Sequence, residues 1–273
     1  MDHDDIERLE IRLLLDAIFH HYGYDFRNYS YASLKRRVAC VQALASADKI
    51  SELLPMLLYD EAFFENFLQH MSITVTEMFR DPSFFSALRT SVIPILKTYP
   101  SVKIWHAGCA TGEEVYSMAI LLHEEGFLDR ALLYATDYNI EALKTVKHGI
   151  YDLTQFRKYT NNYMLSGGKA AFSDYYHARY GSAKLHDFLK ERIVTSRHNL
   201  VCDGVFAEMN LIICRNVMIY FNKDLCARVV NLFTDSLCHR GFLCLGSKES
   251  FNPHESKNHF EEIQRKERIF RKL

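Results

Sequence analysis

The segment IWHAGCATGEEVYSMAI, residues 104–120, carries the residues whose spacing first suggests chemistry. An apolar run enters a turn bounded by Gly108 and Gly112 and leaves as an apolar helix, which is how many nucleotide sites begin. The turn matches neither the dinucleotide pattern G-x-G-x-x-G nor the P-loop pattern, and it contains no lysine. Because Glu113 and Glu114 stand at the helix N-terminus, a phosphate there would meet carboxylates. We therefore expect a phosphate-free ligand that carries hydroxyls or a positive charge.

An acidic residue one strand further along adds to this interpretation. Asp137 ends the next expected strand, 25 residues after Gly112, where a carboxylate can bind both hydroxyls of a ribose. A nucleoside without phosphates and with a cationic centre describes S-adenosylmethionine. Each feature alone has a plain alternative, because glycines are common in turns and acidic residues at a helix start often only stabilise the helix. Strand, turn, helix and strand in this order favour the nucleoside site.

Polar side chains also gather in the stretch SITVTEMFRD, residues 72–81. The hydroxyls of Thr74 and Thr76 and the guanidinium of Arg80 form a polar cluster in an apolar context. The alternative is an ordinary helix start, with Thr76 as the cap of a helix that opens at Pro82.

A third polar group follows the apolar run in LIICRNVMIYF, residues 211–221. The run predicts a buried strand whose end delivers Arg215, Asn216 and Tyr220. Ligands of open α/β sheets bind outside the carboxyl ends of the strands, so this group is well placed. A fixed guanidinium at such a point suits a carboxylate, which it can hold through two parallel hydrogen bonds.

The elements that must position these groups follow two patterns. Residues 1 to about 75 have apolar residues at helical spacing and few strand formers, which predicts an all-helical region. From about residue 100, strands and helices alternate, which predicts an α/β fold with a mostly parallel sheet covered by helices on both faces. We expect strands at 102–107, 131–136, 193–196, 210–214, 242–246 and 268–272, and helices at 113–125, 140–148 and 223–239. Residues 153–192 break the alternation and predict a small antiparallel lobe.

Composition narrows the class of protein further. The chain has 33 Lys+Arg against 34 Asp+Glu, so it shows no global affinity for nucleic acid. Seven cysteines without a C-x-x-C pair, and histidines without an H-E-x-x-H pattern, give no reason to expect a metal site. Neither a signal peptide nor a membrane-spanning run is recognisable. We therefore expect a cytoplasmic protein without membrane insertion.

One local basic segment stands out against this neutral background. Residues 27–47 contain no acidic residue but include Arg27, Lys35, Arg36 and Arg37. The segment is interpreted either as a solvated helix face or as a docking surface for an acidic partner, and the sequence leaves both open.

Taken together, these motifs closely resemble the CheR family of chemotaxis receptor methyltransferases. The resemblance covers nearly the whole chain and includes VTEMFRD, AGCATGEEVYSMAI, ATDYNIEAL, HGIYD, RHNL, ICRNVMIYFN and GSKESF. It implies an N-terminal all-helical domain at residues 1–75 and a Rossmann-like, S-adenosylmethionine-dependent methyltransferase domain at 76–273. A small antiparallel β-subdomain would be inserted at about 153–192. The implied reaction transfers the methyl group to glutamate side chains of chemoreceptor cytoplasmic domains, giving methyl esters and S-adenosylhomocysteine in chemotaxis adaptation.

The resemblance also assigns residues. The implied cofactor contacts are Thr74, Thr76, Arg80, Gly108, Glu114, Asp137, Asn199, Leu200, Arg215 and Asn216. Asp137 would bind the ribose, Asn199 and Leu200 would flank the adenine, and Arg80 would approach the methionine carboxylate or help to close the pocket. As catalytic residues, Arg215 and Tyr220 would face the incoming glutamate. The chain departs from the commoner family pattern at Met78, Val115 and Asn210, none of which is a direct reactant.

Such a reaction needs little acid–base help. A glutamate with a pKa of about 4.3 is already an anion at neutral pH, so catalysis should come mainly from alignment in a dry site. We therefore expect no general base, and His106 and His198 should be structural.

The expected partner is a chemoreceptor's cytoplasmic helices, docked through Lys35, Arg36, Arg37 and the β-subdomain, with the protein acting as a monomer. Two alternatives stay open. The first is a regulatory protein that binds S-adenosylmethionine without turnover. The second is a carboxyl methyltransferase of a non-chemotaxis signalling pathway.

Overall fold

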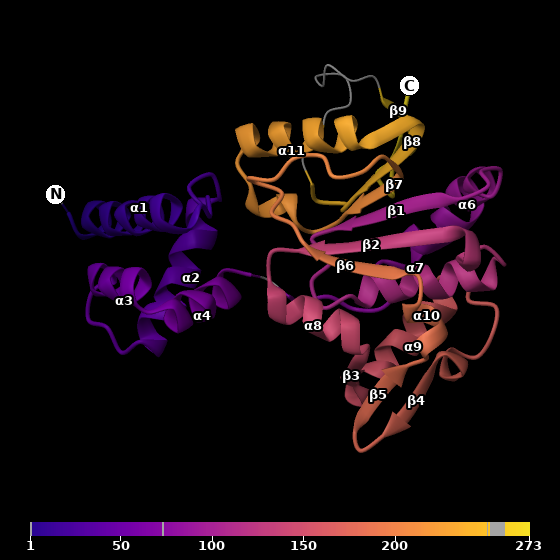
Figure 1. The fold of residues 1–273 in the computed structure, drawn as a ribbon, viewed down its shortest axis with the longest axis horizontal. Helices are drawn as coiled ribbons and strands as arrows, with labels where there is room; N and C mark the ends of the chain where they lie inside the picture. Colours follow the sequence, from indigo (N-terminus) through magenta and orange to yellow (C-terminus); the bar gives the residue numbers. More distant parts are fainter. Residues whose placement is uncertain (1, 73, 250, 252–259) are drawn as a thin grey trace. The chain divides into compact units, whose positions relative to one another are not determined.

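A computed structural model describes residues 2–72, 74–249, 251 and 260–273, and the chain divides into two compact units (Figure 1). The first, called here the helical unit, comprises Met1–Ile73, Val201–Asp203 and Tyr220–Val229. The second, the sheet unit, comprises Thr74–Leu200, Gly204–Ile219 and Val230–Leu273. Each unit is described separately below.

The helical unit confirms the all-helical expectation for the N-terminal region. Its helices are α1 His3–Tyr22, α2 Tyr31–Leu44, α3 Leu53–Tyr59 and α4 Glu61–Met71, with a 3₁₀ turn, η1, at Ile50–Glu52. Helix α1 begins with a reciprocal capping box between Asp2 and Asp5 and ends at Gly23, which has a φ of 77°. Asp60 caps α4 by accepting a hydrogen bond from the Phe63 amide.

The sheet unit is built on a seven-stranded sheet in the order β6-β2-β1-β7-β8-β10-β9. The strands are β1 Val102–Ala107, β2 Ala131–Asp137, β6 Ile193–Arg197, β7 Met209–Cys214, β8 Leu237–Leu245, β9 Phe260–Gln264 and β10 Ile269–Lys272. Neighbouring strands from β6 through β8 pair in parallel, whereas β10 pairs antiparallel with both β8 and β9. The expected mostly parallel sheet is therefore confirmed.

Helices lie on both faces of this sheet, as the alternating side chains of β1 show. On one face Trp105 packs edge-on against Phe233 of α11, with ring centroids 5.4 Å apart. On the other face the Nδ1 atom of His106 lies 3.1 Å from a carboxylate oxygen of Glu114 in α7. The helices with bounds in or adjoining this unit are α5 Pro82–Ala87, α6 Ile93–Leu96, α7 Glu113–Glu124, α8 Ile140–His148, α9 Phe156–Leu165, α10 Asp187–Lys190 and α11 Lys223–Ser236.

The expected antiparallel lobe is present, and it contains a helix in addition to its strands. Strands β3 Ile150–Asp152, β4 Tyr176–Arg179 and β5 Ser182–Leu185 form a second sheet in the order β3-β5-β4. Helix α9 belongs to the same segment and buries Tyr163. Glu124, at the end of α7, accepts hydrogen bonds from the hydroxyls of Tyr163 and Tyr175, which anchors the lobe to the main sheet unit.

Two boundaries differ from the sequence expectations by more than one residue. The helix expected at 223–239 ends at Ser236, and β8 begins at Leu237, well before the expected residue 242. The reason is an irregularity that the sequence hides, because Arg240 has a φ of 65° and the β7–β8 register shifts between Met209 and Leu211. Strand β9 was not expected. Within the described residues, no helix is both long enough and apolar enough to cross a membrane.

Candidate active site

The candidate site lies at the carboxyl ends of β6, β2, β1 and β7 in the sheet unit. Strand β1 pairs with β2 on one side and with β7 on the other, so the strand order reverses at β1, and ligands of open α/β sheets bind at such a point. The segments that follow these four strands contain most of the residues singled out in the sequence.

The turn after β1 is confined by its neighbours. Gly108 and Gly112 have φ values of 75° and 92°, a region that glycine enters without strain. A Cβ atom on Gly108 would lie 2.6 Å from a methyl group of Val217, and one on Gly112 would lie 2.8 Å from a methyl group of Val146. Both positions therefore require glycine for backbone conformation and for space.

Asp137 at the end of β2 is a fixed, buried carboxylate. One oxygen accepts a hydrogen bond from the Ala110 amide and the other from the Asn139 amide, both at 2.9 Å. Burial raises the pKa of Asp137, against the opposing effect of these amides. Each oxygen keeps a lone pair that can accept a ribose hydroxyl. The amide of His198 donates to the Asp137 carbonyl at 3.2 Å, which brings the segment with Asn199 and Leu200 alongside.

Arg215 after β7 is the centre of a buried charge cluster. Its side chain is 3% exposed. One terminal nitrogen lies 3.2 Å from Glu114 and donates to the Arg80 carbonyl at 3.3 Å, and the other pairs with Asp81. The guanidinium carbon also lies 4.1 Å from the centre of the Phe84 ring.

Glu114 links this cluster to the sheet. One of its oxygens contacts Arg215 and the other contacts His106. Burial acts to raise the pKa of Glu114, but the hydrogen bond from His106 and the charge of Arg215 outweigh it and lower the pKa. The carboxylate is thus held as an anion, and the structural role expected for His106 is to orient it.

Backbone strain concentrates at the same place. Among the described residues, eight non-glycine residues have a positive φ, and four of them are Phe79, Asp81, Ala110 and Asn216. These four lie in the segments that lead into α5 and follow β1 and β7. Such strain persists only where the surroundings enforce it, and it clusters at functional sites.

The remaining predicted residues fall as follows. Thr74 and Thr76 lie half-buried in the irregular segment before α5. Thr76 does not cap that helix, because Asp81 occupies the N-cap position and Pro82 follows it. Tyr220 belongs to the helical unit, where the Arg37 guanidinium lies 5.2 Å from its ring centre. The expected catalytic pair of Arg215 and Tyr220 is thus divided between the two units.

The basic segment corrects one expectation. Arg37 is 6% exposed, and its guanidinium donates to the Ser33 hydroxyl and the Met71 carbonyl, so Arg37 is not part of an exposed basic surface. Lys35 is exposed but pairs with Glu7 at 2.9 Å, and Arg36 is exposed. The signal was available, because position 37 shares the buried face of α2 with its apolar residues.

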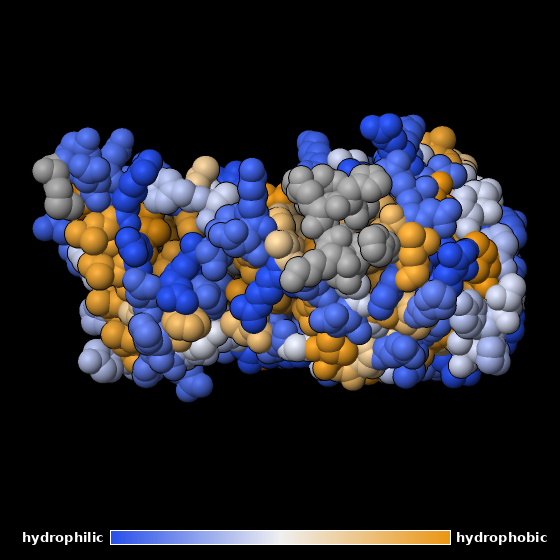
Figure 2. Space-filling model, turned by 90° about the horizontal axis from the view of Figure 1, so that it is seen from above, coloured by the Kyte–Doolittle hydropathy of each residue, from blue (hydrophilic) through white to orange (hydrophobic). Residues whose placement is uncertain are grey.

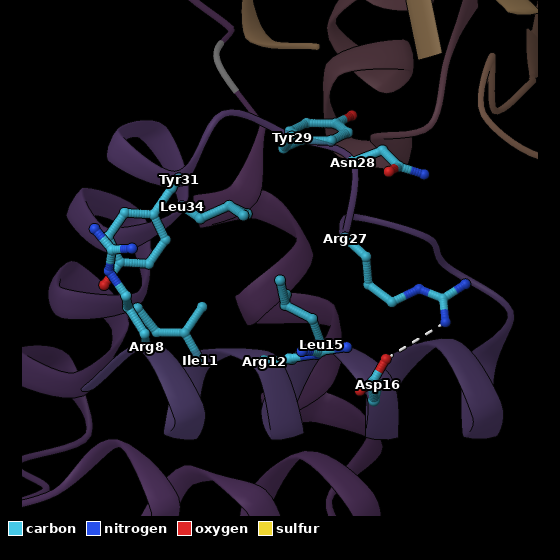
Figure 3. Close-up of a pocket in the computed structure, with 10 residues that line it drawn as sticks. All are labelled: Arg8, Ile11, Arg12, Leu15, Asp16, Arg27, Asn28, Tyr29, Tyr31 and Leu34. Atoms are coloured by element: carbon cyan, nitrogen blue, oxygen red, sulfur yellow. Dashed lines mark hydrogen bonds and ion pairs between the residues drawn. The ribbon is translucent and has the colours of Figure 1, made fainter. Parts of the chain in front are cut away.

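The helical unit also has a hollow of about 560 Å³ between α1 and residues 27–34 (Figure 3). It is lined by Arg8, Ile11, Arg12, Leu15, Asp16, Arg27, Asn28, Tyr29, Tyr31 and Leu34. Arg27 is neutralised by Asp16 and Asp25, whereas Arg8 stacks over the Tyr31 ring. The exposed apolar residues of α1 are Ile6, Leu9 and Leu13, and Figure 2 shows hydrophobic surface on the helical unit.

Two site residues were not expected from the sequence. Asp81 was considered only as a helix start, yet it pairs with Arg215. Glu249, in the closing motif GSKESF, lies buried with its carboxylate against the segment after β7. The motif had drawn attention to this segment but did not indicate a role for the Glu249 carboxylate. Ser250 of the motif lies outside the described residues.

A mostly parallel sheet with a glycine turn after β1, an acidic helix start and a buried carboxylate at the end of β2 fits the class of S-adenosylmethionine-dependent methyltransferases. Residues 74–269 match the family model described as "CheR methyltransferase, SAM binding domain", and residues 9–72 match "CheR methyltransferase, all-alpha domain". The chain belongs to the CheR methyltransferase family.

Two relatives in sequence agree with this assignment, and one solved structure shows a distant likeness. The chain is 51% identical over 266 residues to "Putative methyltransferase Cher3" of Pseudomonas putida KT2440, covering 97% of each chain. It is 26% identical over 138 residues to the "Chemotaxis protein methyltransferase" of Listeria monocytogenes, covering 50% of this chain and 53% of that protein. A glycopeptide N-methyltransferase complexed with sinefungin is similar at a TM-score of 0.38 and 11% identity, covering 69% of this chain and 56% of that one.

Replacing Asp137 with Ala should weaken the binding of S-adenosylmethionine and S-adenosylhomocysteine. The loss should be about 1.5–3 kcal/mol, because hydrogen bonds to a charged group disappear. Isothermal titration calorimetry would measure it, with Asp129→Ala, an exposed carboxylate of the same unit, as the control. Neither NAD nor ATP should compete. Wild-type affinity in Asp137→Ala would refute the ribose assignment.

Replacing Gly108 with Ala should destabilise the protein by about 2–5 kcal/mol, because a left-handed backbone strain adds to overpacking against a stiff valine. Gly126→Ala is the matched control, since Gly126 has a φ of 63° and nothing lies within 4 Å of its Cβ position. It should cost only about 1–2 kcal/mol. Urea unfolding would compare the two variants, and equal losses would show that Val217 does not confine the turn.

Proposed function

We propose that the protein is a protein-glutamate O-methyltransferase that converts glutamate side chains of chemoreceptor cytoplasmic domains to methyl esters. The observation that carries this proposal is the pairing of Arg215 with Asp81, whose side chain is 49% exposed. The buried guanidinium at the end of β7 thus already holds a carboxylate that is itself half exposed to solvent, and a substrate glutamate presents the same group. The proposed reaction takes place in the cytoplasm, where the receptor domains lie.

The residues of the chain have defined tasks in this proposal. S-adenosylmethionine, when bound, supplies a methyl group made electrophilic by its sulfonium centre. Asp137 would hold the ribose, Asn199 and Leu200 would flank the adenine, and the turn at Gly108 would contact the cofactor. Thr74, Thr76, Glu114 and Asn216 would line the rest of the cofactor pocket, and Arg80 would approach the methionine carboxylate or help to close the pocket. Together these residues would hold the cofactor in a fixed position for the substrate.

Arg215 and Tyr220 then orient the substrate carboxylate. Because that carboxylate is an anion above a pH of about 4.3, no residue has to remove a proton from it. Alignment in a site shielded from water provides the rate enhancement. For Arg215 to bind the substrate, the ion pair between Asp81 and one guanidinium nitrogen must break. That nitrogen then donates to the substrate carboxylate instead.

The same pairing favours one alternative. With both terminal nitrogens of Arg215 engaged by Glu114 and Asp81, the chain could bind S-adenosylmethionine as a regulator without turning it over. A methyltransferase that acts on another carboxylate, outside chemotaxis, is the second alternative. An assay of methyl transfer to purified receptor domains separates all three.

With a labelled methyl donor, the product should be a carboxyl methyl ester, and mild base should release the label as methanol. Arg215→Ala should lower kcat much more than Tyr220→Phe, because only the first change removes the charge that orients the carboxylate. Arg215→Lys keeps the charge and serves as the control for folding. Alkali-stable label on nitrogen would exclude the glutamate assignment.

The receptor is proposed to dock on the basic surface of the helical unit and on the β-subdomain. In the helical unit, Lys35 and Arg36 are exposed on α2, and Arg8 and Arg12 line the hollow of Figure 3. In the β-subdomain, the β4–β5 turn presents Tyr180, which is 87% exposed. Cations and exposed aromatic rings of this kind suit an acidic helical partner.

The double change of Lys35 and Arg36 to Ala should raise the KM for the receptor and flatten its dependence on salt. Single exposed pairs contribute only about 0.2–1 kcal/mol, but together they steer association, and salt screens them. Steady-state kinetics from low to high salt would show this. Lys144→Ala with Lys147→Ala, which removes two exposed charges from α8, is the control. An unchanged KM would mean that the basic residues serve only solvation.

A further inference from the structure

The carboxylate of Glu249 joins two loops at the carboxyl end of the sheet. Glu249 is 3% exposed. One of its oxygens accepts hydrogen bonds from the amides of Val217 and Met218, at 2.9 and 3.0 Å, and the other accepts one from the amide of Gly246. Three amides from the segments after β7 and β8 thus converge on one side chain. Burial raises the pKa of Glu249, and these amide hydrogen bonds oppose that effect.

The loop that Glu249 binds, residues 216–218, has features that need stabilisation from outside the loop. Asn216 has a φ of 61°, a strained conformation for a residue with a side chain. Met218 begins the 3₁₀ turn η6 Met218–Tyr220, and amides at a helix start lack partners within the helix. A Cβ atom on Gly246 would lie 2.9 Å from the Asn216 amide nitrogen, so the two loops are in close backbone contact. Glu249 supplies the restraint that both features require.

The same loop bears on both halves of the active site. Val217 lies against Gly108, where an added Cβ would meet its methyl group at 2.6 Å. Arg215, two residues earlier, carries the charge cluster with Glu114 and Asp81. A displacement of residues 217 and 218 would therefore move the support of the glycine turn and the guanidinium together.

We infer that Glu249 is a positioning residue that sets the register between the glycine turn and Arg215. It acts through the backbone amides of Val217 and Met218 and touches neither cofactor nor substrate. Arg268 fixes the backbone on either side of residue 250. The Arg268 guanidinium donates to the Glu249 carbonyl at 2.8 Å and to the Phe251 carbonyl at 3.2 Å. The inference rests on the proposed function only where turnover is measured.

The test compares Glu249→Gln with the wild-type chain. In the variant an amide NH₂ group must face a backbone N–H, so at least one of the three hydrogen bonds is lost. Affinity for S-adenosylhomocysteine, measured by calorimetry, should fall about tenfold, equivalent to about 1.4 kcal/mol. Receptor methylation at saturating cofactor should fall as well, because Arg215 shifts with the loop.

Two controls separate positioning from stability. Glu262→Gln changes an exposed carboxyl on β9 and should alter nothing. Lys272→Ala removes hydrogen bonds to the Thr234 and Leu237 carbonyls, both 2.7 Å long, and should lower the melting temperature without changing cofactor affinity. A folded Glu249→Gln variant with a lowered melting temperature and wild-type cofactor affinity would overturn the inference.

Hydrogen exchange in the wild-type chain tests the same point without a variant. The Val217, Met218 and Gly246 amides should exchange slowly in the absence of cofactor, because each donates to a buried carboxylate. Exchange at the rate of a solvent-exposed amide would overturn the inference, including in the case where Glu249→Gln does not fold. Neither cofactor affinity nor exchange depends on a receptor, so a wild-type chain that methylates no receptor would contradict the proposed function alone.

Discussion

The active site depends on the burial of one charged group, the guanidinium of Arg215, which is almost entirely shielded from water. A buried charge must be matched by charges and hydrogen bonds or it destabilises the fold. Arg215 is matched by Glu114 of α7, by Asp81 at the start of α5 and by the Arg80 carbonyl. These interactions hold three segments that are distant in the sequence, those of Asp81, Glu114 and Arg215, close together at the end of β7. His106 extends the cluster into the sheet, so the site and the core of the sheet unit share one electrostatic network.

In this site, carboxylates of the chain accept the amide hydrogen bonds that a bound phosphate accepts in many nucleotide-binding folds. In nucleotide-binding turns, backbone amides point at a phosphate. Here the Ala110 amide donates to Asp137, and the Val217 and Met218 amides donate to Glu249. These donors are occupied by the chain's own anions and are not available to a pyrophosphate. A cofactor with hydroxyls and a positive charge is the complementary partner, in agreement with the SAM-binding domain that the chain matches.

The sequence predicted best those elements whose signals are local. Strand β1 and helix α8 have the bounds that were expected, because an apolar run and a capped amphipathic stretch each end at a glycine with positive φ. Asp137 was found from its distance to the glycine turn. Glu249 could not be found in this way, since two of its three amide partners lie 32 and 31 residues away in the sequence. Strand β9 escaped notice because it pairs only at the edge of the sheet.

The single tryptophan of the chain gives the site an optical property. Trp105 is fully buried, its indole nitrogen donates to the Thr136 hydroxyl at 2.8 Å, and its ring meets His198 and Phe206 edge-on. His198 immediately precedes the residues proposed to flank the adenine. The emission of the single indole therefore reports on the surroundings of His198, without a second tryptophan to obscure it. If Asn199 and Leu200 contact the cofactor as proposed, its binding should change this emission, and the unlabelled chain then serves as its own probe.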